Sequence, residues 1–161
     1  MGRLGYARYG AQGGDWGSAV TCVLGESHPD HVQGIHVNMP TVGLEPLPAD
    51  ATLFSKDQLL DNVSVYWFTA TGASSARLYW ERASPAVMGA SGMTAQMGAI
   101  MVPTACSVFP REIRRPSRRQ AEQRFVNIHD WNEPTKGGHF AAFEQPEIFV
   151  EEVRAGFRSL R

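Results

Sequence analysis

The sequence predicts an α/β fold, a parallel sheet of about four strands flanked by helices. Short apolar runs alternate along the chain with longer helix-forming segments, which is typical of parallel sheets. The first strand, helix and strand follow one another within about 35 residues, the size of a βαβ unit. Candidate chemical groups come directly after predicted strands, where the loops of such sheets carry their sites.

Composition limits the classes of function. The 161 residues (17.7 kDa) are 43% hydrophobic, so we expect a single domain over 1–161 with a packed core. The formal net charge of −1 argues against a general nucleic-acid binder. No apolar run reaches 18 residues and no signal peptide is recognisable, so we expect no membrane segment and a cytoplasmic protein. Cys22 and Cys106 are expected to be buried, unpaired thiols in a reducing compartment.

The first half of the chain contains the βαβ unit. Tyr6–Gln12 is predicted to be a strand, Trp16–Gly25 a helix, and Val32–Met39 a strand that Pro40 ends. The residues expected on the buried face of the helix are Ala19, Val20, Val23 and Leu24.

The middle of the chain is predicted to be helical between two irregular segments. Thr41–Phe54 is a proline-containing linker without periodicity, and Ala83–Gly98 is rich in small residues. Ser55 is expected to cap a helical region over Lys56–Glu81, with a break near Thr69–Gly72.

The last part returns to alternating elements. Strands are predicted over Ala99–Val108 and Phe125–Trp131, a helix over Pro110–Phe125, and a terminal helix over Gln145–Leu160 after a turn at Gly137–Gly138. The terminal helix is expected to bury Ile148, Val150, Val153, Phe157 and Leu160. One basic run is interpreted as a solvated helix face, with a phosphate or nucleic-acid patch as the alternative: Arg111, Arg114, Arg115, Arg118, Arg119 and Arg124.

Gly13–Gly17 reads Gly-Gly-Asp-Trp-Gly, which fits the Gly-x-nucleophile-x-Gly elbow between a strand and a helix. The nucleophile would be Asp15, a carboxylate. A carboxylate attacks an sp³ carbon and leaves an alkyl ester on the enzyme, which water must then hydrolyse. The five residues alone do not separate this hypothesis from an aspartate in an ordinary glycine turn.

A general base and its orienting acid are expected later in the chain. His139 follows a glycine pair and is the candidate base, although a single histidine is often structural. Glu112 follows the strand that ends near Val108 and is the candidate acid, the alternative being a solvated acid at a helix start. Asp130 and Glu133 are rival acids.

Four blocks of sequence together resemble the epoxide hydrolases of the α/β-hydrolase superfamily, in the microsomal and juvenile-hormone-type branch. They cover about two thirds of the chain and occur in the family's order: Arg8–Gly17 with Gly34–Pro40, Asp61–Trp67 with Thr71–Glu81, Phe109–Glu112, and Gly137–Pro146.

The resemblance implies a role for each residue. Asp15 would be the nucleophile, His139 the base, Glu112 its orienting acid, and Tyr79 the donor to the epoxide oxygen. The backbone N–H of Trp16 would form half of an oxyanion hole, with its indole lining the pocket. The substrates would be a small apolar epoxide and water, the product a vicinal diol, with no cofactor and no metal.

The sequence also departs from the family. The His-Gly-x-Pro oxyanion loop, the early strands and most of the cap have no counterpart, and residues 41–54 replace the cap, so the α/β-hydrolase fold is expected to be partial. Loss of one oxyanion donor typically costs ~10²–10³ in rate, so we expect little or no activity from this chain. The first strand is expected to be an exposed sheet edge through which chains could associate.

Two other functions stay open. A haloalkane dehalogenase shares the aspartate nucleophile and would use a pair of halide-binding tryptophans, of which Trp16 could be one. A non-catalytic remnant would persist by associating through its sheet edge. Two clusters suggest a metal but lack zinc-ligand spacing, so none is expected: His28, Asp30 and His31, and His129, Asp130 and Glu133.

Overall fold

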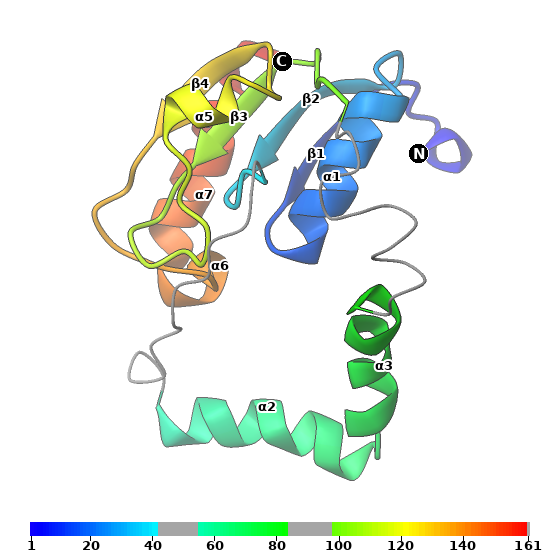
Figure 1. Ribbon diagram of the computed structural model, residues 1–161, viewed down its shortest axis with the longest axis vertical. Coiled ribbons are helices and arrows are strands. Elements are labelled where there is room, and N and C mark those ends of the chain that lie inside the picture. Colours follow the sequence, from blue (N-terminus) through cyan, green and yellow to red (C-terminus); the bar gives the residue numbers. More distant parts are fainter. Residues whose placement is uncertain (42–54, 84–97, 161) are drawn as a thin grey trace. The chain divides into compact units, whose positions relative to one another are not determined.

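The computed structural model describes residues 1–41, 55–83 and 98–160 (Figure 1). The chain divides into two compact units. Met1–Asp50 and Gly98–Arg161 form the first, which we call the sheet unit, and Ala51–Met97 forms the second, the helical unit. Most of the predicted linker and of the predicted irregular segment 83–98 lies outside the described residues.

A four-stranded parallel sheet is the centre of the sheet unit, as the sequence predicts. Its strands lie in chain order: β1 (Tyr9–Gly13), β2 (Val32–Val37), β3 (Thr104–Ser107) and β4 (Ile128–Asn132). All four carboxyl ends therefore meet at the same edge of the sheet. Within the described residues, β1 pairs with β2 and forms one edge of the sheet.

Helices cover both faces of this sheet (Figure 1). On one face, α1 (Trp16–Ser27) and α5 (Arg118–Ala121) close the core cluster of the unit. On the other, α7 (Pro146–Gly156) packs against β2, β3 and β4. The short helix α6 (Ala141–Glu144) leads into α7, and two 3₁₀ turns, η1 (Gly2–Leu4) and η3 (Arg158–Leu160), lie near the chain ends.

The face that α1 buries differs in part from the prediction, although Leu24 packs against the core cluster as expected. Its buried residues are Ser18, Thr21, Cys22 and Gly25. Val20 and Val23 are 59% and 56% exposed. The buried face of α1 consists of small residues because the helix lies close to the core. A Cβ on Gly25 would lie only 3.0 Å from Val102 Cγ2. Cys22 and Cys106 are buried and unpaired, as predicted.

Residues 110–125 are mostly not helical, so that prediction is wrong apart from α5. Two prolines flank the first part of the segment, and Glu112 lies in it fully buried rather than solvated at a helix start. The basic run is correspondingly not one helix face. The side chain of Arg124 is only 10% exposed and lies 3.6 Å from Glu26.

The predicted strand Ala99–Val108 is shorter than expected, because Pro103 lacks the N–H of a ladder residue. In the terminal helix, Glu152 and Gly156 are the buried residues, and Val150 is 43% exposed. The expected apolar face is therefore wrong at Val150, and the buried carboxylate of Glu152 was not predicted from the sequence.

The helical unit contains α2 (Lys56–Phe68) and α3 (Gly72–Ala83). Ser55 caps α2 in a capping box with Gln58, which confirms the predicted start. The predicted break falls between the helices, where Ala70 has a φ of 54°. Among the residues that the structure describes, no helix has the length and apolar character needed to cross a membrane.

Candidate active site

Asp15 occupies the turn between β1 and α1. Its φ of 49° and ψ of −125° lie outside the regions that L-residues favour, a conformation that costs of order 1–3 kcal/mol. Gly13 makes the turn possible, because a Cβ there would stand 2.0 Å from the carbonyl oxygen of Gly17. The side chain of Asp15 is 54% exposed, so its carboxylate is accessible to solvent beyond the carboxyl end of β1.

Residues after β2 support this turn. Gln12 Nε2 donates a hydrogen bond to Asn38 Oδ1 at 3.1 Å, and the Asn38 amide lies where a Cβ on Gly14 would be. The hydroxyl of Ser18 donates to the carbonyl of Met39 at 2.7 Å. The sequence indicated Asn38 only as part of a family block, because an asparagine after a strand carries no distinctive spacing.

The loops after β3 and β4 run side by side beyond the sheet. Arg111 N donates to the Gly137 carbonyl at 3.1 Å, and Arg111 and Gly138 form an isolated parallel bridge. Gly137 has a φ of 101°, and a Cβ on Gly138 would lie 2.9 Å from Arg111 Cβ. The glycine pair thus allows the two loops to touch, and it places Glu112 and His139 next to each other.

His139 lies between the two candidate carboxylates, Glu112 and Asp15. Its Nδ1 lies 2.6 Å from Glu112 Oε1, and its Nε2 lies 3.8 Å from Asp15 Oδ2. Glu112 is fully buried, and its Oε1 also accepts a 2.7 Å hydrogen bond from Ile113 N. Of the rival acids, Glu133 accepts a hydrogen bond from Trp131 instead. The structure therefore brings three of the sequence-predicted residues together.

The electrostatics of this group favour a protonated imidazole. The hydrogen bond that His139 Nδ1 donates to Glu112 is the main cause that raises the pKa of His139 above its ordinary value of 6.5, and the Asp15 carboxylate acts in the same direction. Burial opposes both effects. His139 is thus suited to accept a proton and to hold it between two carboxylates.

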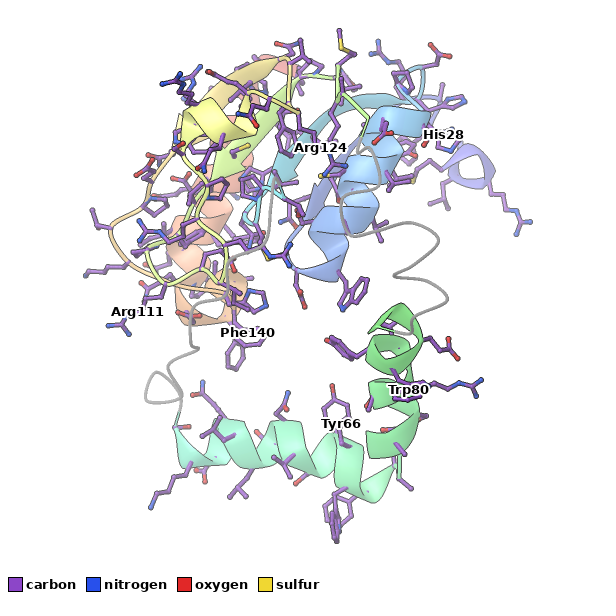
Figure 2. All side chains as sticks on the ribbon, in the orientation of Figure 1. His28, Tyr66, Trp80, Arg111, Arg124 and Phe140 are labelled. Atoms are coloured by element: carbon purple, nitrogen blue, oxygen red, sulfur yellow. The ribbon has the colours of Figure 1, made fainter. Side chains whose placement is uncertain are left out.

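The two other predicted site residues, Trp16 and Tyr79, belong to different units of the chain. Trp16 begins α1, directly after the nucleophile, so its backbone N–H belongs to the first turn of that helix. Tyr79 lies on α3 in the helical unit and is 58% exposed. The ring of Phe140, which Figure 2 labels, meets that of His139 edge-on, and their centroids lie 5.0 Å apart.

Comparisons with known proteins follow this geometry. No family model matches the chain. The whole chain is 37% identical to a protein of Stigmatella aurantiaca that is named as a candidate epoxide hydrolase, and 63% of it is 33% identical to epoxide hydrolase 1 of Sus scrofa. The chain belongs to the epoxide hydrolase family. The resemblance seen in the sequence is confirmed.

The family's fold is confirmed by solved structures. The crystal structure of juvenile hormone epoxide hydrolase from the silkworm Bombyx mori matches all of the chain with a TM-score of 0.81 at 22% identity. An epoxide hydrolase of Aspergillus niger matches all of it with a TM-score of 0.64 at 19% identity. The sheet unit therefore has part of the α/β-hydrolase fold.

The chain spans about half the length of the curated relatives it matches, 49% of the S. aurantiaca protein and 57% of the silkworm chain. The alignment with the former spans 224 positions, more than the 161 residues of this chain. Part of that relative within the aligned region consequently has no counterpart here.

Sequence reasoning missed a second polar cluster on the α7 face of the sheet. His36 Nε2 lies 3.0 Å from Ser107 Oγ, and Ser107 Oγ donates to Glu152 Oε2 at 2.7 Å. Burial lowers the pKa of His36 to about 4, so its imidazole is neutral at physiological pH. The pattern had no sequence signal, because its members come from three separate elements.

Proposed function

We propose that this chain carries the nucleophile, base and acid of an epoxide hydrolase, which opens a small apolar epoxide to a vicinal diol through an alkyl-enzyme ester. One observation carries the proposal: His139 lies between Asp15 and Glu112, with Nε2 3.8 Å from the Asp15 carboxylate and Nδ1 2.6 Å from the buried Glu112. The names of the relatives support the choice of an epoxide as substrate.

In the first step, a carboxylate oxygen of Asp15 attacks one ring carbon of the epoxide. A new C–O ester bond forms, the ring C–O bond breaks, and its electron pair goes to the epoxide oxygen. An alkoxide is a poor leaving group, so the step needs a proton at that oxygen. We assign the proton to the hydroxyl of Tyr79, on the family motif around that residue.

In the second step, His139 takes a proton from water through Nε2, and the resulting hydroxide attacks the carbonyl carbon of the Asp15 ester. The backbone N–H of Trp16 donates to the oxyanion. The tetrahedral intermediate then collapses, the C–O bond between the acyl carbon of Asp15 and the alcohol oxygen breaks, and the diol oxygen takes the proton from His139. Asp15 is left as a carboxylic acid, and its proton passes through solvent to the phenolate of Tyr79, which restores both groups. Glu112 holds the imidazolium that forms between these transfers.

The ester intermediate provides the sharpest test. Little turnover is expected of this chain, but detection of the ester needs only a single round of alkylation. Prolonged incubation with styrene oxide and acid quenching should give a species heavier by the mass of one epoxide, and peptide mapping should locate it on Asp15. In His139→Gln, ester formation should continue while its hydrolysis stops, so the labelled species should accumulate.

Asp15→Asn is the matched control, because it keeps the size of the side chain and removes the nucleophilic charge. It should give no labelled species. A label of equal yield on Asp15→Asn, or on another residue, contradicts the proposal. Release of halide from a chloroalkane, with no reaction of the epoxide, would favour a dehalogenase instead.

The open edge of β1 supports a further proposal, association between copies of this chain. An unpaired strand edge is a template for strand addition, and β1 pairs only with β2 among the described residues. Tyr9 and Gly13 bond to β2 through their backbone, so in the alternation of a parallel ladder the N–H of Gln12 faces the open edge. Sedimentation of the chain, with Gln12→Pro as a variant that removes this N–H, would test it. The two unpaired thiols, both buried, suit a reducing compartment such as the cytoplasm, which fractionation of cells would test.

A further inference from the structure

A directed hydrogen-bond chain lies on the α7 face of the sheet. The hydroxyl of Ser107 donates to Glu152 Oε2, so His36 Nε2 must carry the proton in its own 3.0 Å hydrogen bond to Ser107. Asn132 Nδ2 donates to the other oxygen, Glu152 Oε1, at 2.5 Å. One carboxylate on α7 therefore accepts from the ends of β3 and β4.

This cluster contains a histidine, a serine and a glutamate, but it is not a second hydrolase site. His36 and Ser107 are 0% and 2% exposed, so no substrate reaches them. The order of donation is also wrong for a nucleophile, because Ser107 gives its proton to Glu152 and not to His36.

The position of the cluster in the chain suggests a different role. Ser107 ends β3 and stands five residues before Glu112, whereas Asn132 ends β4 and stands seven residues before His139. Glu152 lies on α7, the helix that continues from the loop of His139 through α6. The carboxylate of Glu152 is thus the common anchor of the three elements that hold the acid and the base.

We propose that Glu152 is a positioning residue, which fixes the spacing between the loops of Glu112 and His139 by holding Ser107 and Asn132 together. The proposal rests on the proposed function only in taking these two side chains as the catalytic acid and base. Where β3 and β4 end, the loops continue side by side, with a 2.9 Å hydrogen bond from Val108 N to the Asn132 carbonyl. A displacement of the end of β3 therefore also moves the loop of His139, and a displacement of the end of β4 moves the loop of Glu112.

The hydrogen bond between His139 and Glu112 provides a readout that needs no turnover. That contact is the main cause of the raised pKa of His139, so a longer contact lowers the value. We would follow the Cε1 proton of His139 by NMR against pH, assigning it with His139→Gln. In Glu152→Gln, an amide replaces the acceptor that faces Asn132 or Ser107, and the pKa should fall by about 1.

Three variants separate positioning from charge and from stability. Ser107→Ala keeps the charge of Glu152 but removes one bond, and it should lower the pKa of His139 in the same direction. Glu151→Gln makes the same charge change on an exposed neighbour in α7 and should leave the pKa unchanged. Asn132→Ala removes one bond at a residue that is itself exposed, and it serves if Glu152→Gln does not fold.

The outcomes are distinct. An unchanged His139 pKa in the folded Glu152→Gln, Ser107→Ala or Asn132→Ala chain overturns the proposal, as does an equal shift in Glu151→Gln. Failure of all three network variants to fold overturns it too, because the cluster would then be needed for folding itself. A lowered pKa without any ester on Asp15 keeps Glu152 as a positioning residue and refutes the epoxide chemistry alone.

Discussion

The Nδ1 atom of His139 lies 2.6 Å from Oε1 of Glu112, a carboxylate with no exposure to solvent. This contact fixes the proton of a neutral His139 on Nδ1 and leaves the lone pair of Nε2 directed to the Asp15 side, 3.8 Å away. The same contact raises the pKa of His139. A single residue, Glu112, therefore both orients the imidazole of His139 and raises its pKa.

The raised pKa predicts how hydrolysis of the ester depends on pH. Only neutral His139 can accept the proton from water, so the rate should rise with pH through a value above the ordinary 6.5. In Glu112→Gln the acid limb should move to lower pH, and the maximal rate should fall because the imidazolium is less stabilised. Single-turnover decay of the labelled Asp15 ester between pH 5 and pH 9 measures both. An acid limb that stays in place in Glu112→Gln would show that another group titrates.

The same shift predicts a change in stability. The folded chain holds the His139 proton more tightly than the unfolded chain, so this contribution is complete below pH 6.5. It is lost as pH rises through the raised value. The free energy of unfolding in urea should therefore fall over that range, and His139→Gln should flatten this part of the profile. His28→Gln, at an exposed histidine, is the control and should leave it in place.

The strained backbone conformation of Asp15 is predicted to lower the free energy of unfolding of the chain. Its φ of 49° and ψ of −125° suit glycine, so Asp15→Gly should raise the free energy of unfolding by about 1–2 kcal/mol while it abolishes ester formation. Asp15→Ala removes the same carboxylate but keeps a Cβ, and it should gain much less. Thermal denaturation of the two variants measures the difference. Equal stability of the two would show that the turn is not strained.

Gly13 and Gly17, which flank the turn at Asp15, are predicted to differ in how much an alanine substitution changes stability. A Cβ on Gly13 would lie 2.0 Å from a backbone oxygen, so Gly13→Ala should cost about 1–3 kcal/mol or more. A Cβ on Gly17 would meet nothing within 4 Å, and Gly17 lies in α1, so Gly17→Ala should be neutral or stabilising by up to about 1 kcal/mol. Urea unfolding of both variants tests this. A destabilised Gly17→Ala chain would mean that the last glycine is needed for a reason other than space.

The elements with local sequence signals were predictable. The strands, the capped helix after Ser55 and the turn at Gly137–Gly138 follow from short-range patterns, and the structure confirms them. The buried face of α1 was not, because its packing depends on how closely the helix approaches the sheet. Small residues allow that approach, and apolar periodicity does not reveal it.

Polar contacts between residues that are distant in the sequence could not be predicted either. The choice of Glu112 over its rivals depended on the family block and on order in the chain, and the contact with His139 became visible only in the fold. Glu152 was not among the residues that the pattern of the terminal helix predicted to be buried, yet it is buried in the structure. Its burial depends on Ser107 and Asn132, which are 45 and 20 residues away in the sequence.

Arg124 departs from the solvated basic run, and its removal is predicted to be costly. It donates to the Thr41 carbonyl at 3.1 Å and lies 3.6 Å from Glu26, which itself accepts from Gly98 N at 3.1 Å. Arg124 and Glu26 thus link two residues of the sheet unit, Thr41 and Gly98, to α1. Arg124→Met should lower the free energy of unfolding by about 1–2 kcal/mol, because it removes the hydrogen bond to the Thr41 carbonyl and the ion pair of a largely buried guanidinium.

Arg118 provides the matched comparison, since it pairs with Glu122 on an exposed helix face at 3.0 Å. Arg118→Met should change stability by no more than about 0.5 kcal/mol, because solvent screens exposed pairs. A double-mutant cycle of Arg124→Met with Glu26→Gln should show coupling that survives 1 M salt, whereas the Arg118–Glu122 coupling should vanish there. If the two arginine variants behave alike, the basic run is solvated throughout, and the interpretation made from sequence alone is restored for Arg124.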